Sequence, residues 1–149
     1  MACPTGVLVV NHPLVHAPLA HWAQHRATTV ALDDGTTCLT FAALYAEVTQ
    51  QAQALEQRQA PATVFVDNAL GTVQQLVAFL GIVASGRCAA VTDPDWPAAV
   101  HQSVQAAFSQ EATHLPAPTP LTPFYIGFTS GSTGHPKGFR RHHQSWTES

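Results

Sequence analysis

A run of ten residues near the carboxyl end of the sequence has the composition of an anion-binding loop. Small hydroxyl residues, glycines and one lysine directly follow the apolar segment 124–128, in the order Thr129-Ser130-Gly131-Ser132-Thr133-Gly134-His135-Pro136-Lys137-Gly138. Glycines let backbone N–H groups converge on phosphate oxygens, and serine and threonine hydroxyls add further donors. Lys137, the only lysine of the chain, adds a mobile positive charge. The sequence therefore predicts a phosphate-binding loop.

This loop differs from two widespread nucleotide-binding patterns. A Walker A element needs Gly-Lys followed by Ser or Thr, whereas here Pro136 precedes Lys137 and Gly138 follows it. The dinucleotide spacing G-x-G-x-x-G is absent as well. A flexible Ser/Gly linker is the simple alternative, but a linker needs neither an apolar strand before it nor Pro-Lys-Gly after it. Phosphate binding is the favoured interpretation.

The elements that must position this loop follow from the periodicity of the apolar residues. Short β-like runs occupy 28–32, 38–40, 63–66, 88–91 and 124–128, and amphipathic patterns predict helices over 41–58, 72–85 and the residues after Pro97. Thr40 is a plausible N-cap and Gly86 a plausible C-terminal stop. Strands separated by helices imply crossover connections, so the fold class is α/β with a mainly parallel sheet.

The domain organisation is simple. The chain of 149 residues suffices for one domain, with αβ layers over 1–115. Four prolines between 116 and 123 predict an extended connector. Segment 124–149 is then expected to hold a strand, the loop and the start of a helix.

Composition excludes several function classes. A net charge of −3 argues against a general binder of nucleic acid or anionic membranes. No apolar run approaches a membrane span, and residues 1–10 lack the positive region of a signal peptide. The three cysteines are odd in number and far apart, so we expect a reduced, cytoplasmic protein. Only 10% of the residues are charged, against roughly 25% in an average soluble domain. Either the surface is polar and uncharged, or part of it is covered by protein that is absent here.

Other chemistry-bearing residues have simpler interpretations. The pairs His12/His16 and His21/His25 have metal-compatible spacing, but prolines interrupt the first pair and a solvated helix face suits the second better, so no metal ligand is predicted. The cysteines at 3, 38 and 88 are too far apart to indicate a metal site. Basic residues at 137, 140 and 141 favour nucleotide phosphate over nucleic acid. Aspartates at 33, 34, 93 and 95 lie at predicted turns, where they stabilise the backbone.

Segment Phe124–Gly138 resembles the phosphate-binding signature of the adenylate-forming superfamily. This superfamily contains acyl-CoA synthetases, nonribosomal peptide adenylation domains and firefly-type luciferases. Segments 39–44, 77–86 and 91–97 are similar to three further family motifs in the same order. The resemblance covers the chain from about Thr28 to the end and implies the N-terminal part of the family's large domain.

The resemblance also implies a reaction. A carboxylate attacks the α-phosphate of Mg-ATP and displaces pyrophosphate, and the acyl-adenylate then passes to a thiol, often coenzyme A. Lys137 would stabilise the leaving pyrophosphate, and His143 would lie near the carboxylate pocket, although His142 precedes it where the family has threonine. The residues that would surround the β- and γ-phosphates are Thr129, Ser130, Gly131, Ser132, Thr133 and Gly134.

Family members are several times longer than this chain, and motifs for magnesium, adenine, ribose and the adenylation lysine are missing. We therefore interpret the chain as an N-terminal fragment of an AMP-forming acyl-CoA ligase of fatty acid metabolism, inactive alone. Its expected partners are a small carboxylate, ATP with Mg²⁺, coenzyme A and the missing C-terminal portion. Two alternatives stay open: a non-catalytic module that binds a nucleotide or a protein, and an amino-acid adenylation domain that loads a carrier protein.

Overall fold

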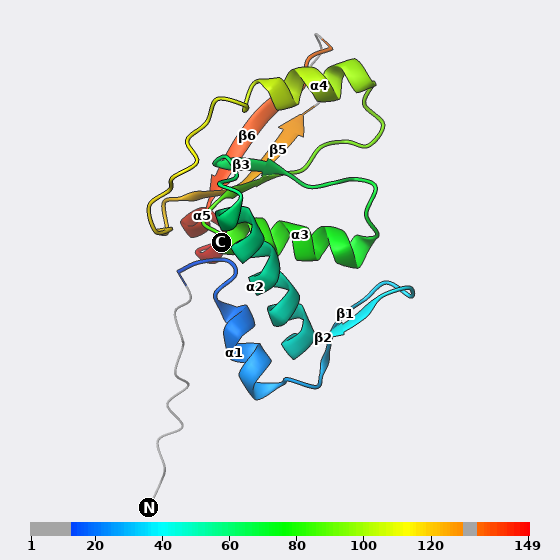
Figure 1. Ribbon diagram of the computed structural model, residues 1–149, viewed down its shortest axis with the longest axis vertical. Coiled ribbons are helices and arrows are strands. Elements are labelled where there is room, and N and C mark those ends of the chain that lie inside the picture. Colours follow the sequence, from blue (N-terminus) through cyan, green and yellow to red (C-terminus); the bar gives the residue numbers. More distant parts are fainter. Residues whose placement is uncertain (1–12, 130–133) are drawn as a thin grey trace, which may run out of the picture.

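The computed structural model describes residues 13–129 and 134–149. Helices and strands alternate along these residues (Figure 1). Their bounds are α1 Pro18–His25, β1 Val30–Asp33, β2 Cys38–Thr40, α2 Phe41–Gln57, β3 Thr63–Phe65, α3 Thr72–Ala84, β4 Cys88–Ala90, α4 Ala98–Ala106, β5 Pro123–Thr129, β6 Lys137–His142 and α5 His143–Thr147.

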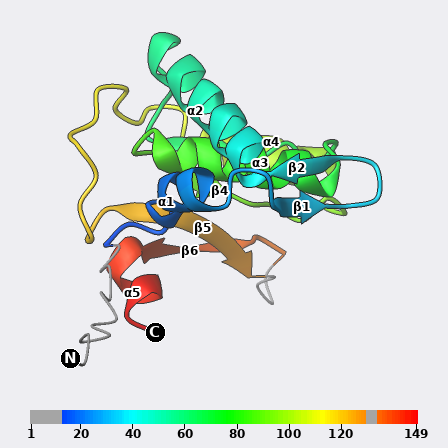
Figure 2. The same cartoon turned by 90° about the horizontal axis from the view of Figure 1, so that it is seen from below.

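The main sheet has the strand order β3-β4-β5-β6. Strands β3, β4 and β5 are parallel, which confirms the α/β class, and β6 is antiparallel to β5. A separate antiparallel hairpin consists of β1 and β2. Figure 2 shows β6 next to β5 at the edge of the sheet, with α5 directly after it.

Strand β6 is the element that the sequence analysis missed. The loop was expected to be followed by a helix with Ser149 in its first turn, and no strand was predicted there. Residues 137–142 instead pair with β5, and α5 begins at His143. Five of its six residues are exposed, and it lacks the apolar alternation that marks a half-buried strand. Pairing with the buried strand β5 supplies the order that its own residue pattern does not indicate.

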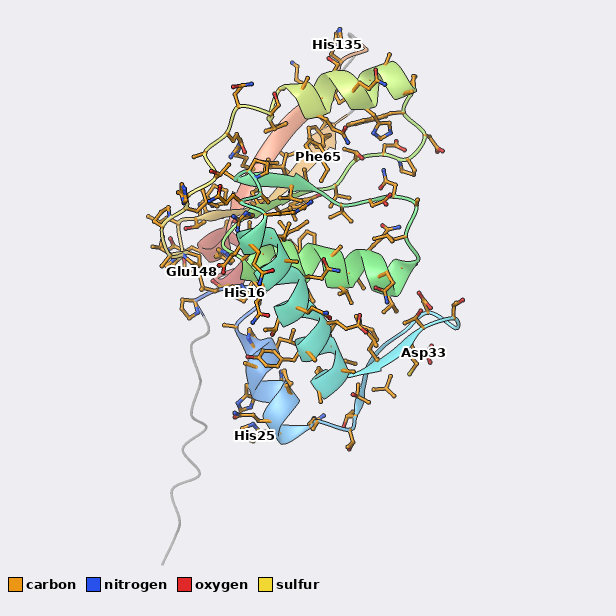
Figure 3. All side chains as sticks on the ribbon, in the orientation of Figure 1. His16, His25, Asp33, Phe65, His135 and Glu148 are labelled. Carbon is orange, nitrogen blue, oxygen red and sulfur yellow. The ribbon has the colours of Figure 1, made fainter. Side chains whose placement is uncertain are left out.

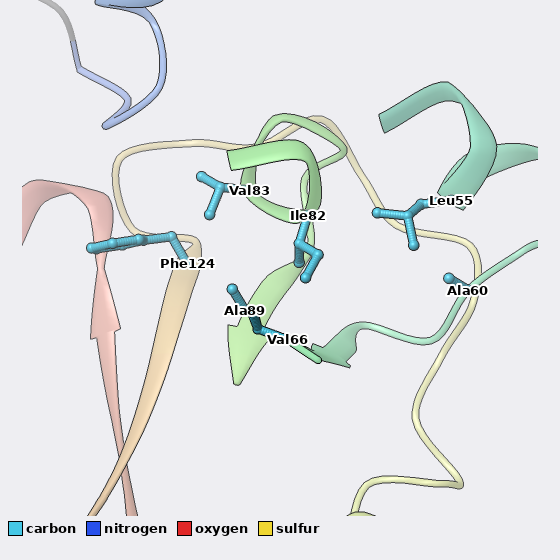
Figure 4. Close-up of a cluster of buried hydrophobic side chains, with 7 residues drawn as sticks. All are labelled: Leu55, Ala60, Val66, Ile82, Val83, Ala89 and Phe124. Atoms are coloured by element: carbon cyan, nitrogen blue, oxygen red, sulfur yellow. The ribbon is translucent and has the colours of Figure 1, made fainter. Parts of the chain in front are cut away.

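Helices cover both faces of the sheet. Helices α2 and α3 lie on one side and α4 on the other (Figure 1). The core on the α2–α3 side consists of Leu55, Ala60, Val66, Ile82, Val83, Ala89 and Phe124 (Figure 4). On the α4 side, Cys88, Ala90 and Ile126 pack with Phe65, Phe108 and Phe128. The central strands are therefore buried on both faces, as expected for parallel strands.

Side chains cap the starts of α2 and α3. The Thr40 hydroxyl accepts a hydrogen bond from the Ala43 N–H at 3.2 Å, which confirms the predicted N-cap of α2. Helix α3 begins after Gly71, which has no side chain to cap it. Asp34 supplies the missing acceptor from the β1–β2 turn, because its Oδ2 accepts from the Val73 N–H at 3.0 Å. One carboxylate thus joins the hairpin to the start of a distant helix.

Candidate phosphate-binding site

The described ends of the predicted loop meet at the carboxyl end of β5. Thr129 pairs with Lys137 in the antiparallel register, and the Thr129 hydroxyl donates to the Lys137 carbonyl oxygen at 3.4 Å. The structure therefore brings two predicted site residues together. The predicted phosphate-binding residues Ser130, Gly131, Ser132 and Thr133 lie outside the described residues, and their roles stay predictions.

Two features of the described loop residues suit an anion. Gly134 has a φ of +78°, a backbone conformation that side chains other than glycine's rarely adopt, while a Cβ at this position would meet no atom within 4 Å. Lys137 is exposed. Among the described residues, the salt bridge of 3.0 Å joins Arg140 to Glu111 and does not include Lys137. No described carboxylate therefore neutralises the Lys137 ammonium.

The carboxyl ends of the three parallel strands form a polar edge next to the loop stem. Asn68 follows β3 and Thr92 follows β4, and the Asn68 amide donates to the Thr92 hydroxyl at 2.9 Å. A cavity of about 370 Å³ lies there, lined by Phe65, Val66, Asp67, Asn68, Thr92, Pro94, His101 and Gln105. Open α/β sheets generally bind ligands at this edge. Neither Asn68 nor Thr92 was predicted as a site residue, although both lie within two residues of the end of a predicted strand.

An aromatic contact links this edge to β5. The ring of Trp96, in the turn after β4, meets the ring of Phe128 edge-on at a centroid distance of 5.4 Å. In the same turn Asp93 accepts a hydrogen bond from the Asp95 N–H at 2.9 Å. The Asp93 carboxylate therefore has the local backbone role that the sequence analysis assigned to it.

His143 lies at the opposite end of the β5–β6 hairpin. The register pairs His142 with Pro123, at the start of β5, while Lys137 pairs with the last residue of that strand. Figure 3 shows the same separation, because His135 of the loop and His16, the neighbour of His143, lie far apart. The structure therefore does not bring His143 and Lys137 together.

The surroundings of His143 are those of a packed core residue. Its ring is 1% exposed, its Nδ1 accepts from the Val15 N–H at 2.9 Å, and the Phe124 ring is 5.1 Å away. Burial, together with smaller contributions from the neighbouring His16 and His142, lowers the pKa of His143 to about 4. The ring is therefore neutral at pH 7, with Nδ1 as an acceptor, and holds no charge for a carboxylate.

The other histidines weighed as metal ligands lie on α1 or pack against His143. His21 and His25 lie on α1, as predicted, with their rings stacked at 4.1 Å. His16 packs against His143 at 5.9 Å, whereas His12 and Cys3 lie outside the described residues.

Within residues 13–129 and 134–149 no three His, Cys, Asp or Glu side chains gather into a metal-binding group. The described helices include none with the length and apolarity that a bilayer crossing requires.

Known proteins with a similar sequence or structure identify the fold. No protein-family model matches the sequence. The chain is 48% identical over 60 residues to an uncharacterized acyl-CoA ligase, YhfT, of Bacillus subtilis (strain 168), a match that covers 40% of this chain and 12% of that protein. The anthranilate CoA ligase AuaEII, solved in complex with anthranoyl-AMP, superposes with a TM-score of 0.69 at 18% identity over 88% of this chain and 34% of that one. An NRPS protein containing adenylation and PCP domains superposes with a TM-score of 0.70 at 20% identity over 89% of this chain and 32% of that one.

The chain has the fold of the N-terminal part of adenylate-forming enzymes. The resemblance seen in the sequence and the expected fold class are both confirmed. The chain spans about a third of the two adenylate-forming structures that it matches. The Thr129–Lys137 pair therefore lies within a fold that matches the start of much longer proteins.

Proposed function

We propose that this chain is the phosphate-binding, N-terminal part of an ATP-dependent ligase that activates a carboxylate, of the AMP-forming acyl-CoA ligase type. The observation that carries the proposal is the pairing of Thr129 with an unneutralised Lys137 at the carboxyl end of β5, on either side of the Ser/Gly-rich run. The match to the acyl-CoA ligase of Bacillus subtilis supports the acyl-CoA type.

The chain's own groups would act on the phosphates of ATP. The hydroxyl of Thr129, with the hydroxyls and backbone N–H groups of residues 130–134, would surround the β- and γ-phosphates. Lys137 begins β6 beside the end of β5, so its ammonium can follow the charge that develops on the departing pyrophosphate. Mg²⁺ would neutralise part of the phosphate charge; since no described residues form a metal-binding group, we expect it to arrive with the nucleotide.

His143 fits a different role from the one first expected. Its buried neutral ring holds the Val15 backbone against the far end of β6, away from the Thr129–Lys137 pair. We propose that it anchors the hairpin, and we do not assign it a contact with the carboxylate.

The whole enzyme would need further polypeptide. The chain contains a single lysine, whereas the resemblance implies a second one for adenylation, so we expect the chain alone to form no acyl-adenylate. An aromatic groove of about 460 Å³ lies beside α5, and it includes Phe139 and Trp146, which are 42% and 59% exposed. Large exposed aromatic surfaces commonly mark contacts with other protein. This groove favours the interpretation that the low-charge surface is covered by the C-terminal portion of the same enzyme.

The molecule that accepts the acyl group distinguishes the leading proposal from its main alternative. Coenzyme A as the thiol, a fatty acyl substrate and a cytoplasmic location belong to the acyl-CoA ligase proposal. The similarity to an NRPS protein with adenylation and PCP domains supports the alternative, an amino-acid adenylation domain that loads a carrier protein. In either case the Thr129–Lys137 pair would bind the same phosphates. A second alternative is a non-catalytic module that binds a nucleotide or a protein. Such a module would have the same loop and groove but would not transfer an acyl group.

A titration of the purified chain with Mg·ATP tests the proposal, followed by NMR of the backbone amides. We expect the amides of Thr129, Gly134 and Lys137 to shift, and Lys137→Ala to weaken binding because it removes the one lysine charge. Arg141→Ala is the matched control, since Arg141 is also exposed but lies near the other end of β6. Shifts confined to other surfaces, or equal effects of both substitutions, would contradict the proposed site.

A further inference from the structure

The two strands that lead into and out of the loop carry a reciprocal arrangement of glycine and phenylalanine. In the register of the hairpin, Gly127 faces Phe139 and Phe128 faces Gly138, immediately before the Thr129–Lys137 pair. Directly paired residues in antiparallel strands point to the same face, and successive residues point to opposite faces. Each face of the hairpin stem thus has one glycine on one strand and one phenylalanine on the other.

On the first face, the phenylalanine ring occupies the space above the glycine. A Cβ added at Gly127 would lie 2.5 Å from Cζ of Phe139 and 2.5 Å from the hydroxyl oxygen of Tyr125. The rings of Tyr125 and Phe139 meet edge-on at 6.0 Å. A methyl group here would therefore force the ends of two aromatic side chains to move.

On the second face the roles of the strands are exchanged. A Cβ at Gly138 would lie 3.2 Å from Cε1 of Phe128 and 3.6 Å from Cγ2 of Ile126. Phe128 is itself held by the edge-on contact with Trp96 and belongs to the core cluster on the α4 side. This ring has less freedom to move away than Phe139, which is 42% exposed.

Aromatic side chains that cover glycines across a strand pair pin the register and the twist of the pair. We propose that the Gly127/Phe139 and Phe128/Gly138 pairs are positioning residues that fix the stem of the phosphate-binding loop and thereby hold the Thr129 hydroxyl and the Lys137 side chain in register for the phosphates. The inference rests on the proposed function, because it assigns these pairs an effect on phosphate binding. None of the four side chains needs to touch the nucleotide.

Gly127→Ala is the decisive variant, with Gly81→Ala as its matched control. Gly81 lies in α3, and a Cβ there would likewise approach a neighbour at 2.5 Å, the Cβ of Gln51 in α2. Both substitutions insert one methyl group into a tight contact, but only the first lies in the loop stem. Urea unfolding of both variants measures the loss of stability, and titration with sodium tripolyphosphate, followed by calorimetry, measures anion binding.

We expect Gly127→Ala to weaken tripolyphosphate binding by at least about fivefold, since small displacements of positioned groups have large effects, while Gly81→Ala leaves it unchanged. The double variant Gly127→Ala/Phe139→Leu removes the clash but also the ring. It should unfold at a higher urea concentration than Gly127→Ala and still bind tripolyphosphate weakly. Equal affinities in all variants, or losses of affinity in proportion to the loss of stability, would overturn the positioning role.

A second measurement separates this inference from the proposed function. Amide hydrogen exchange at Lys137 reports the hairpin end without any ligand, and we expect faster exchange in Gly127→Ala than in Gly81→Ala. If the parent chain binds no tripolyphosphate but the exchange difference appears, the stem is fixed as described and phosphate binding fails. If the parent binds and neither exchange nor affinity responds to Gly127→Ala, the positioning role fails and phosphate binding stands.

Discussion

The buried contact between His143 and the Val15 backbone makes the stability of this chain sensitive to pH. His143 is 1% exposed, and its pKa is lowered by burial to about 4, from an ordinary value of 6.5. The unfolded chain therefore binds a proton at a higher pH than the folded chain does. Stability from this group is complete above about pH 6.5 and is lost progressively as the pH falls toward 4.

The size of the effect follows from the separation of the two pKa values. A shift from 6.5 to about 4 corresponds to roughly 3 kcal/mol in the free energy of unfolding. Most of this, roughly 2 kcal/mol, is lost between pH 7 and pH 4.5. Protonation of Nδ1 also removes the acceptor for the Val15 N–H, so acid should loosen residues 13–15 from the hairpin.

His143→Asn isolates this contribution, because the asparagine Oδ1 can accept the Val15 N–H and does not titrate. Urea unfolding between pH 7 and pH 4.5, followed by circular dichroism, should show a fall in unfolding free energy roughly 2 kcal/mol larger for the parent than for the variant. His114→Asn, at an exposed position, is the control and should leave the pH dependence of the parent intact. Parallel curves for parent and His143→Asn would refute the reasoning.

Three further outcomes are expected. Asp34→Ala should lower the melting temperature and speed amide exchange at Val73, because it removes the cap of α3; Asp33→Ala, one residue away, should leave that exchange rate unchanged. Arg87→Met should lower the free energy of unfolding, measured in urea, by about 3 kcal/mol, since the 4% exposed guanidinium donates to three backbone carbonyls that would lose their partner. In a complete ligase, Lys137→Ala should slow adenylation on the order of 10² to 10³-fold and spare thioester formation from pre-made acyl-adenylate, as pre-steady-state measurement of both half-reactions would show.

Local signals in the sequence were enough to locate most helices and parallel strands. The helix after Thr40 has a regular apolar face and a side-chain cap, and the strand before Thr129 is a continuous apolar run, so both appear where they were expected. Strand β6 could not be found in this way, because its order comes from pairing with β5 rather than from its own residue pattern. Tertiary context commonly overrides local preference in strands.

The site was predictable in part, for a related reason. The composition of the loop predicted Thr129 and Lys137 as site residues, and the structure pairs them in a hairpin, while their contact with phosphate stays a prediction. Sequence spacing alone could not show that His143 lies at the far end of that hairpin, because a six-residue helix segment is much shorter than the six-residue strand that is present. The cap that Asp34 provides for α3 joins residues 39 apart, so no local pattern indicates it.

The two ends of strand β6 are fixed by different means. At His142 the hairpin is followed by the buried His143 ring, which holds Val15, and at Lys137 it is preceded by the glycine–aromatic stem. Among the cations of this strand, Arg140 is paired with Glu111, whereas neither Lys137 nor Arg141 has a described carboxylate partner. Under the proposed function, an exposed cation at the end of a fixed strand would need little reorganisation when an anion arrives, and this would favour electrostatic stabilisation of a departing pyrophosphate.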